Sequence, residues 1–220
     1  MLNNRITIVC GHYGSGKTNF SVNLAVKLAQ QGKNVTITDL DIVNPYFRTA
    51  DHKQLFEQRN IELLAPCFAN TNLDIPVLPR GLAAVMENTD KHVTIDVGGD
   101  DDGSVALGGY SAKLNTLGYE MLYVVNRSRY LADDIDEEVR LIRSIEHCSR
   151  LQITGLVNNT NLGKETTSEL IKNSDLYMKS LSEKASLPII CTAVDKRMID
   201  EFSDTNNLFD IEIYVKTPWE

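Results

Sequence analysis

The chain has 220 residues, 42% of them apolar, and carries a formal net charge of -8 at pH 7. This length suffices for one well-buried core, so we expect a single domain over residues 1–220. The negative net charge argues against binding to nucleic acid or to anionic membranes through overall charge. No apolar run has the length of a membrane span and the N-terminus lacks the layout of a signal peptide, so we expect a cytoplasmic protein without a membrane anchor.

The four cysteines are scattered along the chain and form no CxxC pair, which argues against a local zinc or cluster site. They are Cys10, Cys67, Cys148 and Cys191. The simplest interpretation is a reduced protein in which these thiols act as small buried side chains.

Strand-like and helical segments alternate along the chain. The first strand, 6–10, ends in glycine, and the helix predicted over 18–31 has an apolar side and stops at Gly32. Pro45 interrupts the segment 40–48, which we therefore expect to be a loop. The other predicted elements are a strand at 35–38, a helix at 49–59, strands at 61–65, 92–97 and 121–125, a helix at 132–148, a strand at 152–157, a helix at 165–185, and strands at 188–193 and 211–215. This alternation implies right-handed βαβ units and an α/β fold, a doubly wound, mainly parallel sheet with helices on both faces.

The first strand runs into a segment that matches the P-loop pattern Gly-x4-Gly-Lys-Thr at every fixed position. Its glycines let the backbone fold around phosphates, and Lys17 places a cation against the β- and γ-phosphates. Thr18 offers a hydroxyl to Mg²⁺ and opens the helix whose positive end faces the anion. An ordinary glycine-rich turn is the alternative, but the strand before the segment and the amphipathic helix after it favour a P-loop. The residues expected to contact nucleotide here are Gly11, His12, Tyr13, Gly14, Ser15, Gly16, Lys17, Thr18 and Asn19.

Carboxylates follow two of the predicted strands, at the sheet edge where ligands gather in such folds. Asp96 ends an apolar strand and precedes Gly98 and Gly99, which is the Walker B arrangement, while Asp39 and Asp41 follow the strand after the P-loop helix. We expect Asp39 and Asp96 to hold Mg²⁺ together with Thr18. Asp41 would orient the attacking water or accept its proton. A turn cap for Asp96 and a solvated strand end for the pair are the alternatives.

On these residues the chain resembles the MinD/ParA/nitrogenase-iron-protein group of P-loop ATPases, in the SIMIBI class, over most of its length. The discriminating segment is 38–45, Thr-Asp-Leu-Asp-Ile-Val-Asn-Pro, which is similar to the group's first switch. The resemblance implies that Asp41 positions the hydrolytic water, so that Lys17 and Asp41 are the catalytic residues. Asp96 and Gly99 match the second switch, in which the glycine N–H senses the γ-phosphate.

The same resemblance suggests a site for the base. Residues 155–159 are similar to a strand whose terminal asparagine reads the adenine edge, with Asn159 aligned best and Asn158 second. Residues 188–195 resemble the last core strand and the loop that packs on the base, which assigns Val194 and Asp195 to this site. No guanine-reading Asn-Lys-x-Asp tetrad occurs in the sequence, which favours ATP over GTP.

The chain also departs from the group. Members carry a lysine that reaches across a dimer where this chain has His12, a shorter side chain that is mostly neutral at pH 7. The cysteines that bridge an iron–sulfur cluster in nitrogenase-type proteins are missing after Gly99, and the C-terminus lacks the basic amphipathic helix of the cell-division member. Residues 14–18 are also similar to the GTPases that insert nickel into urease and hydrogenase.

The leading functional hypothesis is a Mg-ATP-dependent accessory ATPase that changes a surface for a protein partner, with metalloenzyme maturation as the suggested pathway. ATP would order two switches, residues 41–51 and 98–104, and would favour a homodimer. Tyr46, Phe47 and Arg48 in the first switch are candidates for partner contact or for packing beneath the loop. The alternatives are an ATP-dependent synthetase like the dethiobiotin and cobyrinate-amidation enzymes, and a nucleotide sensor that does not hydrolyse.

Overall fold

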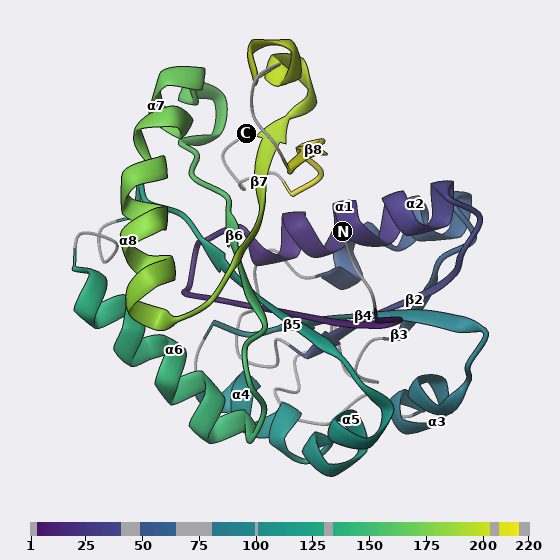
Figure 1. Ribbon diagram of the computed structural model, residues 1–220. Helices are drawn as coiled ribbons and strands as arrows, with labels where there is room; N and C mark the ends of the chain where they lie inside the picture. Colours follow the sequence, from purple (N-terminus) through teal and green to yellow (C-terminus); the bar gives the residue numbers. More distant parts are fainter. Residues whose placement is uncertain are drawn as a thin grey trace, which may run out of the picture.

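The strands of the computed structural model, which describes residues 4–40, 49–64, 81–99, 101–129, 134–202 and 207–215, form one sheet (Figure 1). Within these residues the sheet has eight strands in the order β3-β2-β4-β1-β5-β6-β7-β8, and all neighbouring pairs are parallel. The strands are β1 (Ile6–Cys10), β2 (Asn34–Leu40), β3 (Glu62–Leu64), β4 (Lys91–Val97), β5 (Glu120–Val125), β6 (Gly155–Asn158), β7 (Ile189–Asp195) and β8 (Leu208–Ile211). The predicted fold class, a doubly wound parallel α/β sheet, is confirmed.

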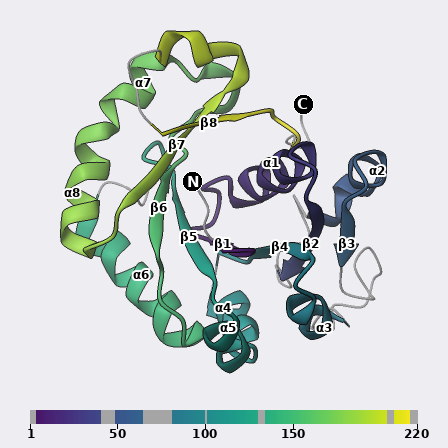
Figure 2. The ribbon, with the colours of Figure 1, turned by 45° about the vertical axis from the view of Figure 1, so that its right-hand side comes forward.

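Helices cover both faces of the sheet, as the two views in Figures 1 and 2 show. One apolar cluster joins β1, β4 and β5 to helices α3 to α6 and α8, while α1 and α2 bury their apolar sides against the opposite face. The helices are α1 (Lys17–Gln30), α2 (Lys53–Gln58), α3 (Leu82–Glu87), α4 (Asp101–Gly108), α5 (Ser111–Leu117), α6 (Ile135–Ser149), α7 (Ser168–Asn173) and α8 (Asp175–Ala185), with 3-10 turns η1 (Thr49–His52), η3 (Gly163–Glu165) and η4 (Lys196–Phe202). None of the helices in the described part of the chain combines the length and apolar character needed to cross a bilayer.

The predicted helix at 165–185 is two helices, α7 and α8, with Ser174 at the break. The Ser174 hydroxyl donates to the carbonyl of Ile171 (2.6 Å) and accepts from the amide of Asn158 (2.8 Å). The break between the two helices is therefore stabilised by a hydrogen bond from Asn158 of β6. Helical spacing in the sequence does not reveal this contact. Three short helices, α3, α4 and α5, were not predicted, because six to eight residues carry too little periodicity.

The last strand lies at 208–211, before its predicted position of 211–215. The backbone after it is bound to α1 by two asparagine side chains. The Asn23 amide donates to the Glu212 carbonyl (2.8 Å) and its oxygen accepts from the Glu212 N–H (2.8 Å). Asn19 donates to the same carbonyl (3.1 Å), and its oxygen accepts from the Tyr214 N–H (2.9 Å). These bonds occupy backbone groups that a continuing strand would use.

Cys10 and Cys191 are buried free thiols, as predicted, and Cys148 is half-buried, whereas Cys67 lies outside the described residues. Burial raises the pKa of the Cys191 thiol to about 12 and that of Cys10 also well above its ordinary value. Both thiols therefore act as apolar packing groups at neutral pH.

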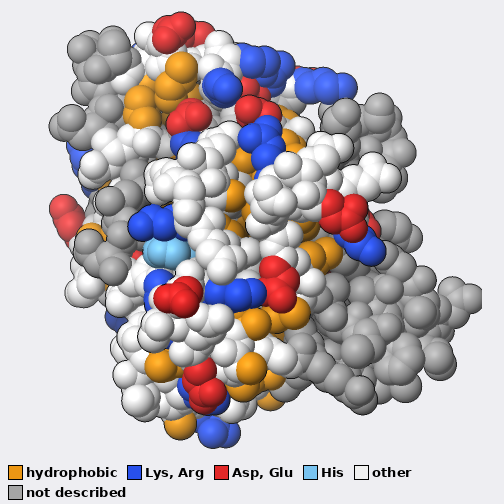
Figure 3. Space-filling model, turned by 90° about the vertical axis from the view of Figure 1, so that its right-hand side faces the viewer, with side chains coloured by type: hydrophobic (Ala, Val, Ile, Leu, Met, Phe, Trp, Pro, Cys, Tyr) orange, Lys and Arg blue, Asp and Glu red, His pale blue; other side chains and the backbone are white. Residues whose placement is uncertain are grey.

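Basic and acidic side chains are interspersed on the face of the molecule shown in Figure 3. Ion pairs join different elements, including Lys91 of β4 with Glu62 of β3, on either side of β2, and Lys113 of α5 with Glu87 of α3. Exposed pairs of this kind add little stability, but they mix the two signs of charge over the surface.

A buried hydrogen bond between Tyr123 and Glu138 joins β5 to α6. Tyr123 lies opposite Cys10 in the β1–β5 register and is fully buried, and its hydroxyl donates to Glu138 Oε1 over 2.7 Å. Burial raises the pKa of the Glu138 carboxyl, and this hydroxyl opposes the rise by donating to the ionised form. The bond therefore holds α6 at a fixed position behind the end of β1.

We predict that Tyr123→Phe lowers the free energy of unfolding by about 1–3 kcal/mol, because it leaves a buried carboxyl without its hydroxyl partner. Urea denaturation measures the loss. Tyr119→Phe is the matched control, since the Tyr119 hydroxyl accepts an exposed bond from the Gln152 N–H (2.8 Å). Equal losses in the two variants would contradict the role assigned to the buried bond.

Candidate functional site

The P-loop, residues 11–18, connects β1 to α1 at the carboxyl edge of the sheet. Its conformation requires glycine at two positions where the backbone is left-handed and crowded. Gly11 has φ +144°, and a Cβ atom there would lie 2.4 Å from the Val124 carbonyl oxygen. Gly16 has φ +87°, and a Cβ atom there would lie 2.4 Å from Asn159 Nδ2. The two glycines let the loop approach the ends of β5 and β6 more closely than it could if any other residue stood at these positions.

The carbonyl groups of the loop from His12 to Gly16 all accept hydrogen bonds from within the protein. Their donors are, in the order of the carbonyls, the Ser15 N–H (3.1 Å) and Lys17 Nζ (3.2 Å) to His12, His12 Nδ1 to Tyr13 (2.8 Å), Arg129 Nε to Gly14 (2.9 Å), Asn159 Nδ2 to Ser15 (2.7 Å) and the Phe20 N–H to Gly16 (3.0 Å). Five successive carbonyls of the loop are therefore held by hydrogen bonds. A run of backbone N–H groups held in such a curve is an anion-binding concavity.

Two polar side chains of the loop fit a phosphate ligand. The Ser15 hydroxyl is buried and has no hydrogen-bond partner within the described residues. Buried polar groups are nearly always paired, so this oxygen suits a ligand rich in oxygen atoms. Lys17 is 6% exposed, and its Nζ would lie 2.8 Å from a Cβ atom at Gly99. The cation therefore lies between the P-loop and the glycine predicted to sense the γ-phosphate.

Gly99 follows β4 and lies directly against the P-loop. A Cβ atom there would be 2.8 Å from the Tyr13 nitrogen and 3.0 Å from its Cα. The backbone of the second switch thus reaches the backbone of the loop, and only glycine permits this approach.

The carboxylate of Asp96 lies at the centre of a group of hydroxyls. Ser21 Oγ donates to one carboxylate oxygen (3.0 Å) and Thr49 Oγ1 to the other (2.8 Å). Burial raises the pKa of Asp96, while the bond from Thr49, the charge of Lys17 and the hydroxyls of Thr18 and Ser21 oppose the rise. A buried carboxylate surrounded by hydroxyl groups is a suitable donor set for hydrated Mg²⁺.

The strand register places Asp39 opposite Asp96, on the neighbouring strands β2 and β4. Asp39 is 2% exposed. Thr18, Asp39 and Asp96, the three residues predicted from sequence to hold the metal, therefore belong to one region of the sheet edge. Asp41, the predicted catalytic carboxylate, lies outside the described residues, as does the rest of the segment 41–48.

The residues assigned to the base make contacts inside the protein. Asn159 donates to the Ser15 carbonyl, so its amide supports the P-loop. Asn158 donates to Ser174, and its oxygen accepts from the Thr160 N–H (3.2 Å) and hydroxyl (2.7 Å). The base-reading role of these two amides stays a prediction.

Val194 and Asp195 lie at the end of β7, three strands away from β1 in the sheet. Val194 is fully buried, packed with Ile171 and Phe202, and Asp195 accepts two bonds from Arg197 Nε (3.0 Å each). Their assignment to the base also stays a prediction. Asn19 is committed to the backbone after β8, as described above.

Three residues of the site were not predicted from the sequence. Ser21 lies one helical turn beyond Lys17 and Thr18, so its position on the same face of α1 is a signal that spacing could have given. Thr49 and Arg129 come from segments distant in sequence, and only the folded chain brings them to Asp96 and Gly14.

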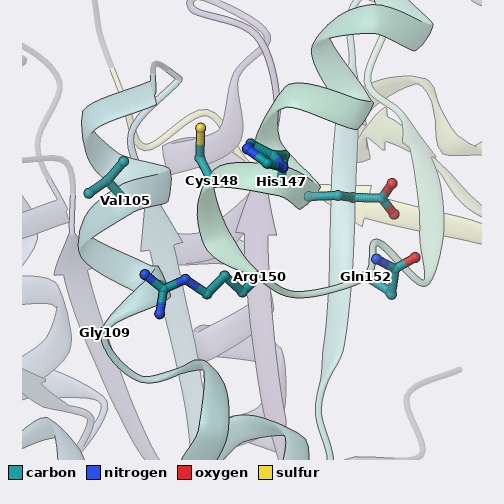
Figure 4. Close-up of a pocket in the computed structure, with 8 residues that line it drawn as sticks. Val105, Gly109, His147, Cys148, Arg150 and Gln152 are labelled. Carbon is teal, nitrogen blue, oxygen red and sulfur yellow. The ribbon is translucent and has the colours of Figure 1, made fainter.

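A cavity of about 790 Å³ lies elsewhere, between α4 and the end of α6 (Figure 4). Val105 and Gly109 line it on one side, and His147, Cys148 and Arg150 line it on the other. It adjoins the end of α4 that is remote from Gly99. No group of three or more His, Cys, Asp or Glu side chains is gathered as a metal site in the part of the chain that the structure describes.

A phosphate-cradling loop between β1 and α1, a buried lysine, and carboxylates at the adjoining strand ends define a P-loop nucleotide-binding protein. The chain belongs to the family described as the CobQ/CobB/MinD/ParA nucleotide binding domain, whose match spans residues 6–199. The resemblance proposed from the sequence is thus confirmed. No curated protein is similar enough to be matched.

Solved structures with this fold include FtsY proteins and a signal recognition particle protein. FtsY from Mycoplasma mycoides has a TM-score of 0.53 and 17% identity, covering 88% of this chain and 62% of that one. Chloroplast FtsY from Physcomitrella patens has a TM-score of 0.59 and 17% identity, with 89% and 60% covered. The signal recognition particle 54 kDa protein from Aeropyrum pernix K1, in complex with GDP, has a TM-score of 0.56 and 15% identity, with 87% and 41% covered. The chain thus spans less than two thirds of these proteins, and they share its fold.

We predict that Asp96→Asn stabilises the protein at pH 7 in the absence of added nucleotide. Because burial raises the pKa of Asp96 above its ordinary 3.8, the folded protein holds the proton more tightly than the unfolded chain does. The stability of the wild type therefore falls as pH rises through the folded-state pKa, and the neutral amide avoids this loss.

Urea denaturation at a series of pH values measures the difference, which should shrink as the pH is lowered. Asp90→Asn is the control, since Asp90 is exposed. A wild type that is as stable as the Asp96 variant at pH 7 would show that the carboxylate carries no desolvation cost.

Proposed function

We propose that the protein is a Mg-ATP-dependent switch that hydrolyses ATP and presents a surface to a protein partner. The observation that carries this proposal is the chain of glycine contacts from the P-loop to α4. Gly99 touches Lys17 and the backbone of Tyr13, and a Cβ atom at Gly103, in the first turn of α4, would lie 2.8 Å from the Gly98 nitrogen. A γ-phosphate bound by Lys17 would act on the Gly98–Gly99 backbone and, through it, on α4.

The residues of the site divide the chemistry among them. The loop N–H groups and Lys17 would bind the phosphates, and Thr18, Asp39 and Asp96 would hold Mg²⁺. The metal ion would neutralise charge on the phosphate oxygens. Asp41 would orient the attacking water and accept its proton, as the sequence suggested.

The far end of α4 supports a surface that responds to nucleotide. Gly108 packs so closely on α6 that a Cβ atom there would lie 2.8 Å from the Cys148 carbonyl oxygen. Val105, on the same helix, is 59% exposed. A shift of α4 would therefore change both the α4–α6 contact and the apolar surface beside the cavity. We propose this region as the partner-responsive surface, a nucleotide-dependent homodimer as the active form, and metalloenzyme maturation as the pathway.

ATP is the proposed nucleotide because of the residues at the end of β6 and in the loop that follows it. The segment Asn158-Asn159-Thr160-Asn161 has neither the lysine nor the aspartate of the guanine-reading tetrad. An aspartate there would accept hydrogen bonds from the guanine edge, and a neutral asparagine amide does this more weakly.

We predict that Lys17→Ala weakens the binding of Mg-ATP by at least about tenfold, because a hydrogen bond to a charged group contributes about 1.5–3 kcal/mol. Isothermal titration calorimetry with ATP and with GTP measures affinity and base preference together. Lys53→Ala, at an exposed lysine of α2, is the control. Unchanged affinity in the folded Lys17 variant, or tighter binding of GTP by the wild type, would contradict the assignment.

We predict that Asp41→Ala keeps nucleotide affinity but slows hydrolysis by about 10²- to 10⁴-fold, the usual contribution of a general base. Phosphate release is followed with no added small-molecule substrate, which separates an ATPase from a synthetase. The ATP-loaded variant should also elute earlier from gel filtration than the same protein without nucleotide. Unchanged turnover would remove Asp41 from the catalytic site, and an unchanged elution volume would argue against the dimer.

A further inference from the structure

Arg129 lies against the middle of the P-loop, although it comes from the turn after β5. Its Nε donates to the Gly14 carbonyl over 2.9 Å. A Cβ atom at Gly14 would lie 3.4 Å from Arg129 Cζ and Nε and 3.7 Å from Nη2. The guanidinium group therefore packs against the loop at Gly14, where no side chain stands in its way.

The turn that carries Arg129 is firmly built. Asn126 is 4% exposed, and its oxygen accepts from the N–H groups of Ser128 (3.0 Å) and Asn161 (3.1 Å). The Asn126 amide donates to the Asn161 carbonyl (3.1 Å), and the Arg129 N–H donates to the Asn126 carbonyl (3.1 Å). The backbone of Arg129 is thus fixed to the loop after β6, which itself supports the P-loop through Asn159. The position of the arginine is preorganised.

The guanidinium retains most of its hydrogen-bonding capacity. Arginine has five N–H donors in a planar fork, and among the described residues only Nε of Arg129 has an acceptor. The side chain is exposed. By contrast, Arg127, two residues earlier, stacks on Tyr177 at 5.0 Å from the ring centroid. Arg129 is therefore a charged fork held at the loop, with its Nη groups available to phosphate oxygens.

The charge supplied by the loop itself is small for phosphoryl transfer. Lys17, the only lysine or arginine among residues 11–18, is buried in it, and His12 Nδ1 donates to the carbonyl of Tyr13. In P-loop enzymes an arginine supplied in cis or in trans stabilises the charge that develops on the phosphates. We propose that Arg129 is a catalytic residue that contacts the phosphate chain of the nucleotide in cis. This inference rests on the proposed hydrolysis of ATP.

The step that Arg129 would assist is the cleavage of the bond between the γ-phosphorus and the bridging oxygen. The oxygen of a water molecule forms a bond to the γ-phosphorus, and the electron pair of the broken bond stays on the β-phosphate of the departing ADP. One proton of the water remains on inorganic phosphate at neutral pH, and the other passes to Asp41, the proposed base, and from there to solvent. Negative charge grows on the bridging oxygen, and the Nη groups of Arg129 donate hydrogen bonds that stabilise it.

The experiment compares Arg129→Ala and Arg129→Lys with wild type and with the control Arg127→Ala. For each protein, Kd for a non-hydrolysable ATP analogue with Mg²⁺ is measured by calorimetry, and kcat by phosphate release. We expect Arg129→Ala to lower kcat by at least about 100-fold while Kd rises less than about tenfold, in keeping with the large effect of such arginines. Arg129→Lys should stay below about a tenth of wild-type kcat, because lysine can reach Gly14 but lacks the planar fork. Addition of guanidinium chloride should partly restore kcat in Arg129→Ala.

Wild-type turnover in Arg129→Ala would overturn the proposal. Wild-type turnover in Arg129→Lys would also overturn it, because the arginine would then only support the Gly14 carbonyl. The same loss in Arg127→Ala would overturn it too, by attributing the effect to the turn as a whole. Failure of the proposed function is a different result, because the wild type itself would then show no binding of the analogue or no release of phosphate.

Discussion

The hydrogen bonding of the P-loop carbonyl groups is the constraint on which the rest of the site depends. Each such bond is worth only about 1 kcal/mol net, yet leaving the Ser15 carbonyl unpaired, where its bond to Asn159 is buried, would cost about 1–3 kcal/mol. Apart from the bonds within the loop, the donors come from α1, from the turn after β5 and from the loop after β6, so three segments must be in place before the loop has its shape. The parallel register of β1, β5 and β6 brings these segments to the same edge. Fold and site are therefore coupled through the backbone of the loop.

The buried carboxylate of Asp96 lowers the stability of the protein. Asp96 is 1% exposed, and burial raises its pKa even though Lys17 and three hydroxyl groups oppose the rise. An apolar residue in the same position would avoid the desolvation cost, so the carboxylate is explained by chemistry and not by packing. Its place at the end of β4, opposite Asp39, follows from the sheet register.

Much of the fold and the local part of the site could be predicted from the sequence. The P-loop is contiguous, so its spacing alone encodes the glycine conformations and the position of Lys17, and the parallel-sheet rule brings Asp96 to the same edge. Contacts between distant segments could not be predicted. Ser174 ends a helix because Asn158 of β6 binds its hydroxyl, and Arg129 meets Gly14 because a buried asparagine fixes its turn. The roles assigned to Asn158 and Asn159 came from a resemblance, and a resemblance does not specify which groups inside this chain bind those amides.

The two cations beside the P-loop differ in burial, and the difference has an electrostatic reason. Lys17 is 6% exposed, and Asp96 compensates its charge. The charge of Lys17 in turn opposes the rise that burial causes in the pKa of Asp96. A second cation buried in the same loop would add a further desolvation cost of several kcal/mol. Arg129 avoids this cost, since its side chain is exposed where it packs on Gly14. Arginine suits such a position because it stays charged and binds phosphate through a planar fork. A permanent second charge therefore reaches the loop from the turn after β5.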